Sequence, residues 1–179
     1  MIAAIWGGIY FLTAEARDRA YEDGLRQGSN LSRVFEQYIA RAISGIDGQL
    51  LVFRKLYEQD PAHFAFESWI DRAATPSNLT VHFSITGADG IIRLSSLGPV
   101  SSVIDISARE PFRVHAGTAA DELYISQPSV GHLSGKLSLQ LTRRLITADG
   151  TFGGIITASL DIVELERFYN SIDIGRLSP

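Results

Sequence analysis

The spacing of hydrophobic residues changes once along this chain, near residue 78, and this change constrains the fold more than any other feature. Between Leu31 and Tyr57, apolar residues recur at steps of three and four, which predicts one long amphipathic helix. From Leu79 onward they alternate with polar residues over short segments, which is typical of half-buried strands. Because these strands do not alternate regularly with helices, we expect an antiparallel sheet in an α+β domain.

Turn residues divide the alternating region into five expected strands. Asp89-Gly90 separates the first two and Asp149-Gly150 the last two, and such pairs predict hairpins. Gly153-Gly154 predicts a bulge or the close packing of a helix. Short helices are expected beside the sheet, one of them with Ser107 as its N-cap residue. The expected strands span 79–86, 91–96, 123–127, 136–147 and 152–162, and the expected short helices span 64–73, 107–116 and 163–172.

The long helix is longer than the core of one small domain can cover. If residues 15–26 are helical as well, it extends about 60 Å from the apolar start of the chain, at a rise of roughly 1.5 Å per residue. Part of its apolar stripe must then face something else, and a second copy of the same helix is the economical partner. The sequence therefore predicts a homodimer through this helix.

Residues 1–12 (MIAAIWGGIYFL) form an uncharged apolar run. A helix of this length spans roughly 18 Å, whereas a bilayer core needs about 30 Å. The run lacks the basic residues and the small-residue cleavage site of a signal peptide. We interpret it as the outer half of a transmembrane helix, and the alternative is the buried or interfacial start of a helix.

Composition and motifs exclude several classes of function. The 179 residues carry a net charge of −4, so the basic excess of a nucleic-acid binder is missing. The chain has no cysteine, and its four histidines lack the spacing of metal ligands, so no metal and no cofactor are expected. It has no nucleophile–base signature and no phosphate-binding glycine loop. We therefore expect no enzyme, and a hydrolase is the least favoured alternative.

Several segments carry a resemblance to a known family. They are 105–112 (DISAREPF), 123–128 (LYISQP), 141–144 (LTRR), 149–154 (DGTFGG) and 158–161 (ASLD). Together with the long helix, they resemble the Cache (PAS-like, double-Cache type) extracytoplasmic sensor domains of bacterial receptors, which precede histidine kinases, diguanylate cyclases and chemoreceptors. The resemblance implies a long N-terminal helix packed on a PAS-like five-stranded antiparallel sheet. It also implies a receptor in the bacterial inner membrane, with this membrane-distal lobe in the periplasm or outside the cell.

The resemblance also implies an organisation into four parts. Residues 1–12 would be a partial transmembrane helix that holds the chain in the membrane, and 13–58 a helix for signalling and dimerisation. Residues 59–173 would form the sensor domain. Residues 174–179 would begin a linker to a membrane-proximal lobe.

In this family the ligand pocket lies between the central sheet and the helix and loops that cross it, and the ligands are small polar metabolites. Members that bind amino acids have an arginine with aromatic residues at the second and third positions after it, and an aspartate at the end of the last strand. Arg109 and Asp161 match these two charges. Pro111 replaces the first aromatic residue and Ile104 stands where a tyrosine is usual, which argues against an ordinary α-amino acid as the ligand.

Reasoning from the residues adds further candidates. The guanidinium of Arg109 can pair bidentately with a carboxylate, and Asp161 can accept hydrogen bonds from an amine or a hydroxyl. The expected ligand is therefore a carboxylate or an amine-bearing metabolite. The alternative is that Arg109 and Asp161 form structural ion pairs and that Asp161 caps the last helix. The further candidates are His115, two helical turns beyond Arg109; Tyr124 and Ser126, on one strand face; and Arg143, which must point away from Arg144.

Two hypotheses about function follow. The first is a non-catalytic sensory module that binds a small, anionic metabolite and passes a conformational change along the long helix. The second is a structural dimerisation module of a receptor that has no small-molecule ligand.

Overall fold

The computed structural model describes residues 33, 35–66, 68, 81–163 and 166–167. The chain divides into two compact units, Met1–Arg41 with Ile174–Pro179, and Ala42–Asp173. In the first unit the described residues, 33 and 35–41, are helical. Residues 1–12, and most of the expected helices 64–73 and 163–172, lie outside the described residues. Within the described part of the chain, no helix is both long enough and apolar enough to cross a membrane.

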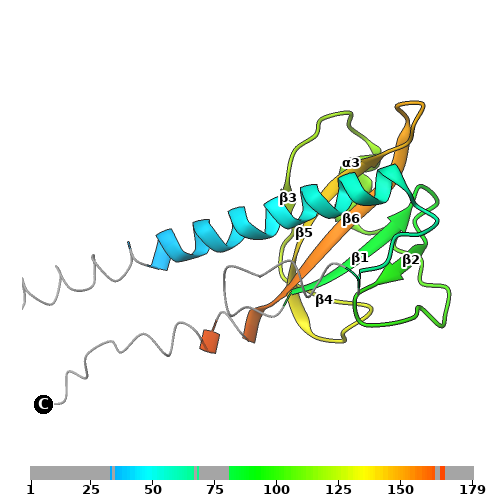
Figure 1. Ribbon diagram of the computed structural model, residues 1–179. Coiled ribbons are helices and arrows are strands. Elements are labelled where there is room, and N and C mark those ends of the chain that lie inside the picture. The colour runs from blue at the N-terminus through cyan, green and yellow to red at the C-terminus, as the bar shows by residue number, and fades with distance from the viewer. Residues whose placement is uncertain (1–32, 34, 67, 69–80, 164–165, 168–179) are drawn as a thin grey trace, which may run out of the picture. The chain divides into compact units, whose positions relative to one another are not determined.

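The second unit is built on one antiparallel sheet (Figure 1). Its strands run in the spatial order β2-β1-β6-β5-β3, and β4 also pairs with β5. They are β1 (Val81–Gly87), β2 (Ile92–Ser95), β3 (Tyr124–Ile125), β4 (Ser129–Val130), β5 (Leu137–Ile146) and β6 (Phe152–Asp161). The α+β prediction is confirmed, but the sheet has six strands rather than five. The additional strand, β4, has two residues, which is too short to show an alternating pattern.

Glycines allow the tight connections of the sheet. Gly90 and Gly150 have φ angles of 81° and 82° in the two hairpin turns, which confirms the predicted hairpins. Gly154, with a φ of 116°, lies opposite Gly87 in the β1–β6 ladder. A Cβ atom at Gly154 would lie 1.9 Å from the carbonyl oxygen of Thr86, so only glycine lets the two strands approach. The register of β5 and β6 shifts beside it, as a bulge requires.

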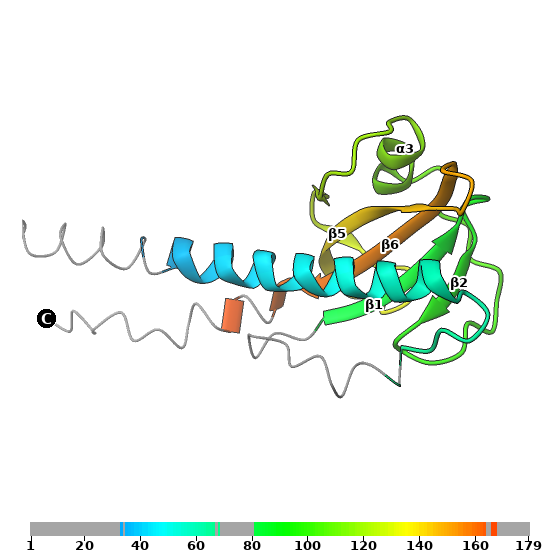
Figure 2. The same cartoon turned by 45° about the horizontal axis from the view of Figure 1, so that its top comes forward.

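The long helix is described at residue 33 and throughout 35–59, and its residues 42–59 cover one face of the sheet (Figure 2). Four buried side chains at steps of four and three face the sheet: Ala42, Ile46, Leu50 and Phe53. The Phe53 ring lies 4.9 Å from that of Phe83 on β1, centre to centre, and both join a cluster with Phe64 and Phe66. Burying such a side chain contributes about 1.5–3 kcal/mol. The amphipathic helix predicted for this segment is confirmed.

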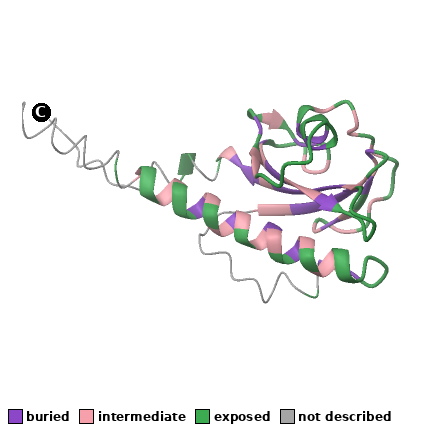
Figure 3. Cartoon of the chain, turned by 90° about the horizontal axis from the view of Figure 1, so that it is seen from above, coloured by how far each residue is buried: buried purple, intermediate pink, exposed green. Residues whose placement is uncertain are grey.

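Helix α3 (Glu110–Ala116) lies on the opposite face of the sheet (Figure 3). The prediction that Ser107 caps it is wrong, because the N-cap residue is Arg109, whose side chain makes no capping hydrogen bond. The backbone N–H of Ser107 instead donates to Asp105 in a tight turn, and Pro111 stands in the first helical turn. This late start leaves the Arg109 side chain at the junction between the loop and α3.

Candidate ligand-binding site

The sheet face beneath α3 is polar along its central strands, whereas the face beneath the long helix is apolar. Successive side chains on a strand point to opposite faces, so every second residue of β1, β5 and β6 reaches the α3 side. The register places His82 of β1 and Gln140 of β5 on either side of Ser159 in β6. The polar residues of this face are His82, Ser84, Thr86, Ser138, Gln140, Thr142, Thr157, Ser159 and Asp161.

Part of this polar face forms the floor of a cleft. The cleft has a volume of about 40 Å³. This is room for roughly three water molecules, at 10–15 Å³ for each. Arg109, Ile106 and the loop at 131–134 form its walls. His82, Ser84, Gln140, Thr157 and Ser159 form its floor.

Arg109 brings a positive charge to this cleft. Its Nη1 donates to the carbonyl oxygen of Val130 at 3.3 Å. Among the described residues, no carboxylate forms an ion pair with Arg109. A guanidinium without a counter-ion at the wall of a cleft can pair with a ligand carboxylate or phosphate through two parallel hydrogen bonds.

The floor offers hydrogen-bonding groups that the described part of the protein does not use. The hydroxyls of Ser84, Thr157 and Ser159 and the carboxamide of Gln140 make no hydrogen bond with described residues. Ser84 and Thr157 are 8% and 5% exposed. None of these side chains has a polar atom that is fully buried without a partner, so their hydrogen-bonding groups are accessible from the cleft and can bind a molecule that enters it.

His82 is the titratable group on the floor. Burial lowers its pKa, and the positive charge of Lys136 lowers it further, while Asp161 acts in the opposite direction. The imidazole is therefore neutral at pH 7, with one nitrogen as a donor and the other as an acceptor. His82 can bind a ligand through hydrogen bonds without adding a charge.

Asp161 does not line the cleft. Its Oδ2 accepts a hydrogen bond from Lys136 Nζ at 3.0 Å, and its Oδ1 accepts one from the backbone N–H of Val163 at 2.9 Å. Burial acts to raise its pKa, but these two hydrogen bonds outweigh that effect and hold the pKa below its usual value. The arrangement is that of the structural alternative, in which Asp161 caps the following helical turn.

His115 lies in the last turn of α3, and none of His115, Tyr124 and Ser126 lines the 40 Å³ cleft. The Nε2 of His115 is 2.9 Å from the Thr142 hydroxyl, and its ring packs edge-on against Tyr124. Ser126 accepts a hydrogen bond from the backbone N–H of Gln140 at 3.1 Å. Ser126 also lines, with Arg109, a more open groove of about 350 Å³.

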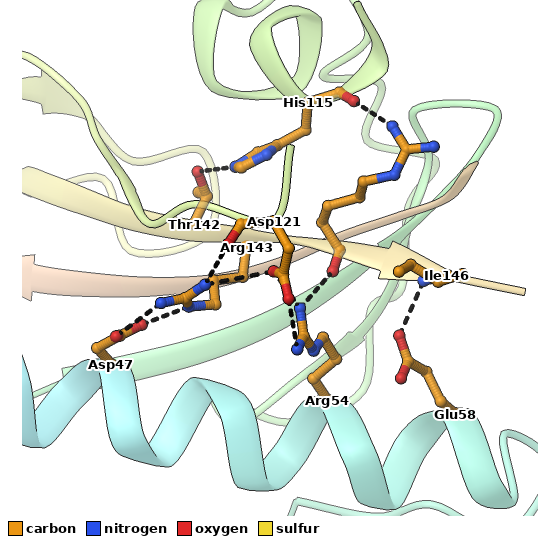
Figure 4. Close-up of polar contacts among 9 residues, drawn as sticks. Asp47, Arg54, Glu58, His115, Asp121, Thr142, Arg143 and Ile146 are labelled. Atoms are coloured by element: carbon orange, nitrogen blue, oxygen red, sulfur yellow. Dashed lines mark hydrogen bonds and ion pairs between the residues drawn. The ribbon is translucent and has the colours of Figure 1, made fainter. Parts of the chain in front are cut away.

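Arg143 faces the long helix, on the other side of the sheet (Figure 4). Its Nε and Nη2 donate to the two carboxylate oxygens of Asp47 at 2.5 and 2.8 Å. Its Nη1 lies 3.3 Å from Asp121, which also pairs with Arg54 of the helix. We call Asp47, Arg54, Asp121 and Arg143 the Arg143 cluster. Arg144 points to the α3 side and donates to the carbonyl oxygen of His115 at 2.8 Å, so the two arginines point apart as predicted.

Of the six predicted site residues, the structure therefore places only Arg109 at the small cleft. The floor residues His82, Ser84, Gln140, Thr157 and Ser159 were not among the sequence candidates. The sequence did contain a signal for them, since serine and threonine alternate with apolar residues at Ser84 and Thr86 in β1 and at Thr157 and Ser159 in β6. No group of three or more histidine, aspartate or glutamate side chains placed to hold a metal ion occurs within the described residues.

Neither a scan of protein-family models nor a search of curated proteins found a match. Solved structures do match. The extracellular domain of a protein designated a histidine kinase has a TM-score of 0.69 and 28% identity, over 82% of this chain and 61% of its own. An extracellular ligand-binding receptor from Desulfohalobium retbaense has a TM-score of 0.64 and 18% identity, over 76% of this chain and 25% of its own.

A third similar structure is the ligand-binding domain of the Campylobacter jejuni chemoreceptor Tlp3, in complex with L-valine. Its TM-score is 0.54 and its identity 12%, over 83% of this chain and 64% of its own. The chain thus spans about three fifths of the length of the histidine-kinase domain. These neighbours are extracellular sensor and ligand-binding domains rather than catalytic ones, and the chain has their Cache-like fold, which confirms the resemblance seen in the sequence.

Proposed function

We propose that this chain is the ligand-sensing part of a bacterial membrane receptor and that it binds a small anionic metabolite in the periplasm. One observation carries the proposal: Arg109, without a carboxylate partner among the described residues, lines a cleft whose floor is made of unused hydrogen-bonding groups. The similar structures support it, because they are extracellular sensor domains and one of them holds L-valine.

The polar floor favours sensing over a purely structural role. The hydroxyls of Ser84, Thr157 and Ser159 are accessible from the cleft, where a domain that only separates and orients subunits would have no need of them. A ligand held by these hydroxyls and by Arg109 shifts the domain between two arrangements if it binds one arrangement more tightly than the other.

The long helix would transmit the conformational change that ligand binding causes. The Arg143 cluster joins that helix to β5 and to the segment after α3, while Arg144, the next residue of β5, holds the end of α3. A displacement of α3 by a ligand at Arg109 would therefore reach the helix through neighbouring residues of one strand. In the full receptor, the helix at 13–58 would form a homodimer, residues 1–12 would lie in the inner membrane, and the output domain would be a kinase or a cyclase.

The test is a thermal-shift screen of the chain against small carboxylates, amino acids and polyamines. A ligand at 100 times its Kd stabilises the folded state by about 2.7 kcal/mol, which raises Tm by several degrees. The expected result is a shift with one or more anionic compounds that is lost in Arg109→Ala. Arg113→Ala, which removes an exposed arginine of the same helix, is the matched control and should keep the shift.

Two results would contradict the proposal. The first is a screen in which no compound raises Tm, which would favour the ligand-free dimerisation module. The second is a ligand whose shift is the same in the Arg109→Ala variant and in the unaltered chain.

A further inference from the structure

We propose that the cleft beside Arg109 selects a small 2-hydroxycarboxylate and rejects the α-amino acid of the same shape. This inference rests on the proposed function and names the class of ligand. It follows from three properties of the cleft: the sign of its charges, the kind of hydrogen-bonding groups on its floor, and its size.

The charges of the cleft suit a carboxylate but not an ammonium group. Arg109 supplies one positive charge with no opposing carboxylate among the described residues. The carboxylate beyond the floor, Asp161, has both oxygens occupied, by Lys136 and by the N–H of Val163. Glu110, beside Arg109 in the chain, lines the open groove and not the cleft. An ammonium group that enters the cleft would lose its hydration without gaining an anionic partner, which is costly.

The floor groups suit an uncharged hydroxyl. The hydroxyls of Ser84, Thr157 and Ser159 can each donate or accept, and so can the carboxamide of Gln140. A hydroxyl on the carbon next to the carboxylate would both donate to this floor and accept from it. A site that hydrogen-bonds a ligand hydroxyl discriminates strongly against the analogue that lacks it, because the protein groups are then left unpaired.

The size of the cleft limits the ligand further. Its volume of about 40 Å³ corresponds to roughly three water molecules. A molecule such as glycolate or lactate displaces about this much water. Ile106 and Leu133 also line the cleft, so a ligand with a longer side chain has to extend past these apolar residues or out of the open side of the cleft.

The test uses pairs of ligands that differ only in the group next to the carboxylate. Isothermal titration calorimetry of the chain at pH 7.5 would compare glycolate with glycine and L-lactate with L-alanine, with acetate and propionate as the acids that lack the hydroxyl. We expect each hydroxy acid to bind at least tenfold more tightly than its amino acid and than the unsubstituted acid.

Two variants and one control test whether the ligand binds in this cleft. Arg109→Ala should weaken glycolate or lactate binding at least tenfold, and Arg113→Ala should leave it unchanged. Ser159→Ala should weaken the hydroxy acid more than acetate or propionate. The melting curve of each variant, measured without ligand, shows that it is folded.

The proposal is overturned if glycine or alanine binds as tightly as its hydroxy acid, if acetate equals glycolate, or if none of the six compounds binds. The experiments distinguish a wrong ligand class from a wrong sensing function. An amino acid or a larger anion that binds in an Arg109-dependent manner would refute the first and leave the second standing, whereas silence across the wider screen would refute both.

Discussion

The ion pair between Asp47 of the long helix and Arg143 of β5 allows a quantitative prediction. These two residues are 96 positions apart in the sequence, so their pair joins the helix to the sheet. The Arg143 side chain is 12% exposed and that of Asp47 is 21% exposed. Exposed ion pairs contribute about 0–1 kcal/mol, whereas the loss of one partner from a buried pair costs about 3–5 kcal/mol. A mostly buried bidentate pair lies between these limits, so we expect Arg143→Ala to lower the free energy of unfolding by about 2–3 kcal/mol.

Replacing Asp47 and replacing Arg143 should lower the free energy of unfolding by different amounts. In Arg143→Ala, Asp47 keeps no ion pair among the described residues, whereas in Asp47→Ala the guanidinium of Arg143 still lies 3.3 Å from Asp121. We therefore expect Asp47→Ala to cost less, about 1–2 kcal/mol, and a double-mutant cycle to give a coupling of about 1–2 kcal/mol.

Urea unfolding followed by circular dichroism at 222 nm measures these values, since the helix dominates that signal. Lys55→Ala, which alters an exposed cation on the same helix, is the control and should change stability by less than about 0.5 kcal/mol. The reasoning is refuted if Arg143→Ala falls within that same margin, or if the coupling in the cycle is zero.

Three further predictions concern the core, the sheet and pH. Phe53→Ala should cost about 3–5 kcal/mol in urea unfolding, because this ring is buried at the centre of an aromatic cluster; a cost below 1 kcal/mol would contradict the packing. Gly154→Ala should lower the melting temperature strongly, because the added Cβ atom would meet the carbonyl oxygen of Thr86. Gly48→Ala is the control: it has open space around it, so the change should be neutral or stabilising by up to about 1 kcal/mol. Burial lowers the pKa of His115 in the folded chain, so the unfolded chain binds the proton first. The free energy of unfolding should therefore fall as pH drops below about 6.5, and it should fall less in His115→Gln. Urea unfolding at pH 7.5 and 5.5 would measure both changes. An equal fall in the variant and the unaltered chain would exclude His115 as a cause.

The sequence alone predicted the long helix and five of the six strands in the part of the chain that the structure describes, whereas residues 64–66, expected to begin a helix, are not helical. The three- and four-residue spacing before Tyr57 and the alternation after Leu79 are local properties, and each fits only one backbone period. The same locality explains the two hairpins, because Asp-Gly turns depend on the conformations of a few neighbouring residues. Sequence-based prediction failed where the local pattern was weakest, at the two-residue strand β4 and at the start of α3.

Only the tertiary structure decided which candidate residues meet. Alternation tells which residues of one strand share a face, but not which face the long helix covers. That choice depends on the pairing of β1 with β6, segments distant in the sequence, which sets His82 opposite Ser159, while β5 places Gln140 on the other side of Ser159. The same pairing placed Arg143 on the helix side, opposite Asp47, and left Arg109 at the cleft on the other side. A charged residue acquires its role from the groups that pack against it in the folded chain, because ion pairing and burial depend on distance in space rather than along the chain.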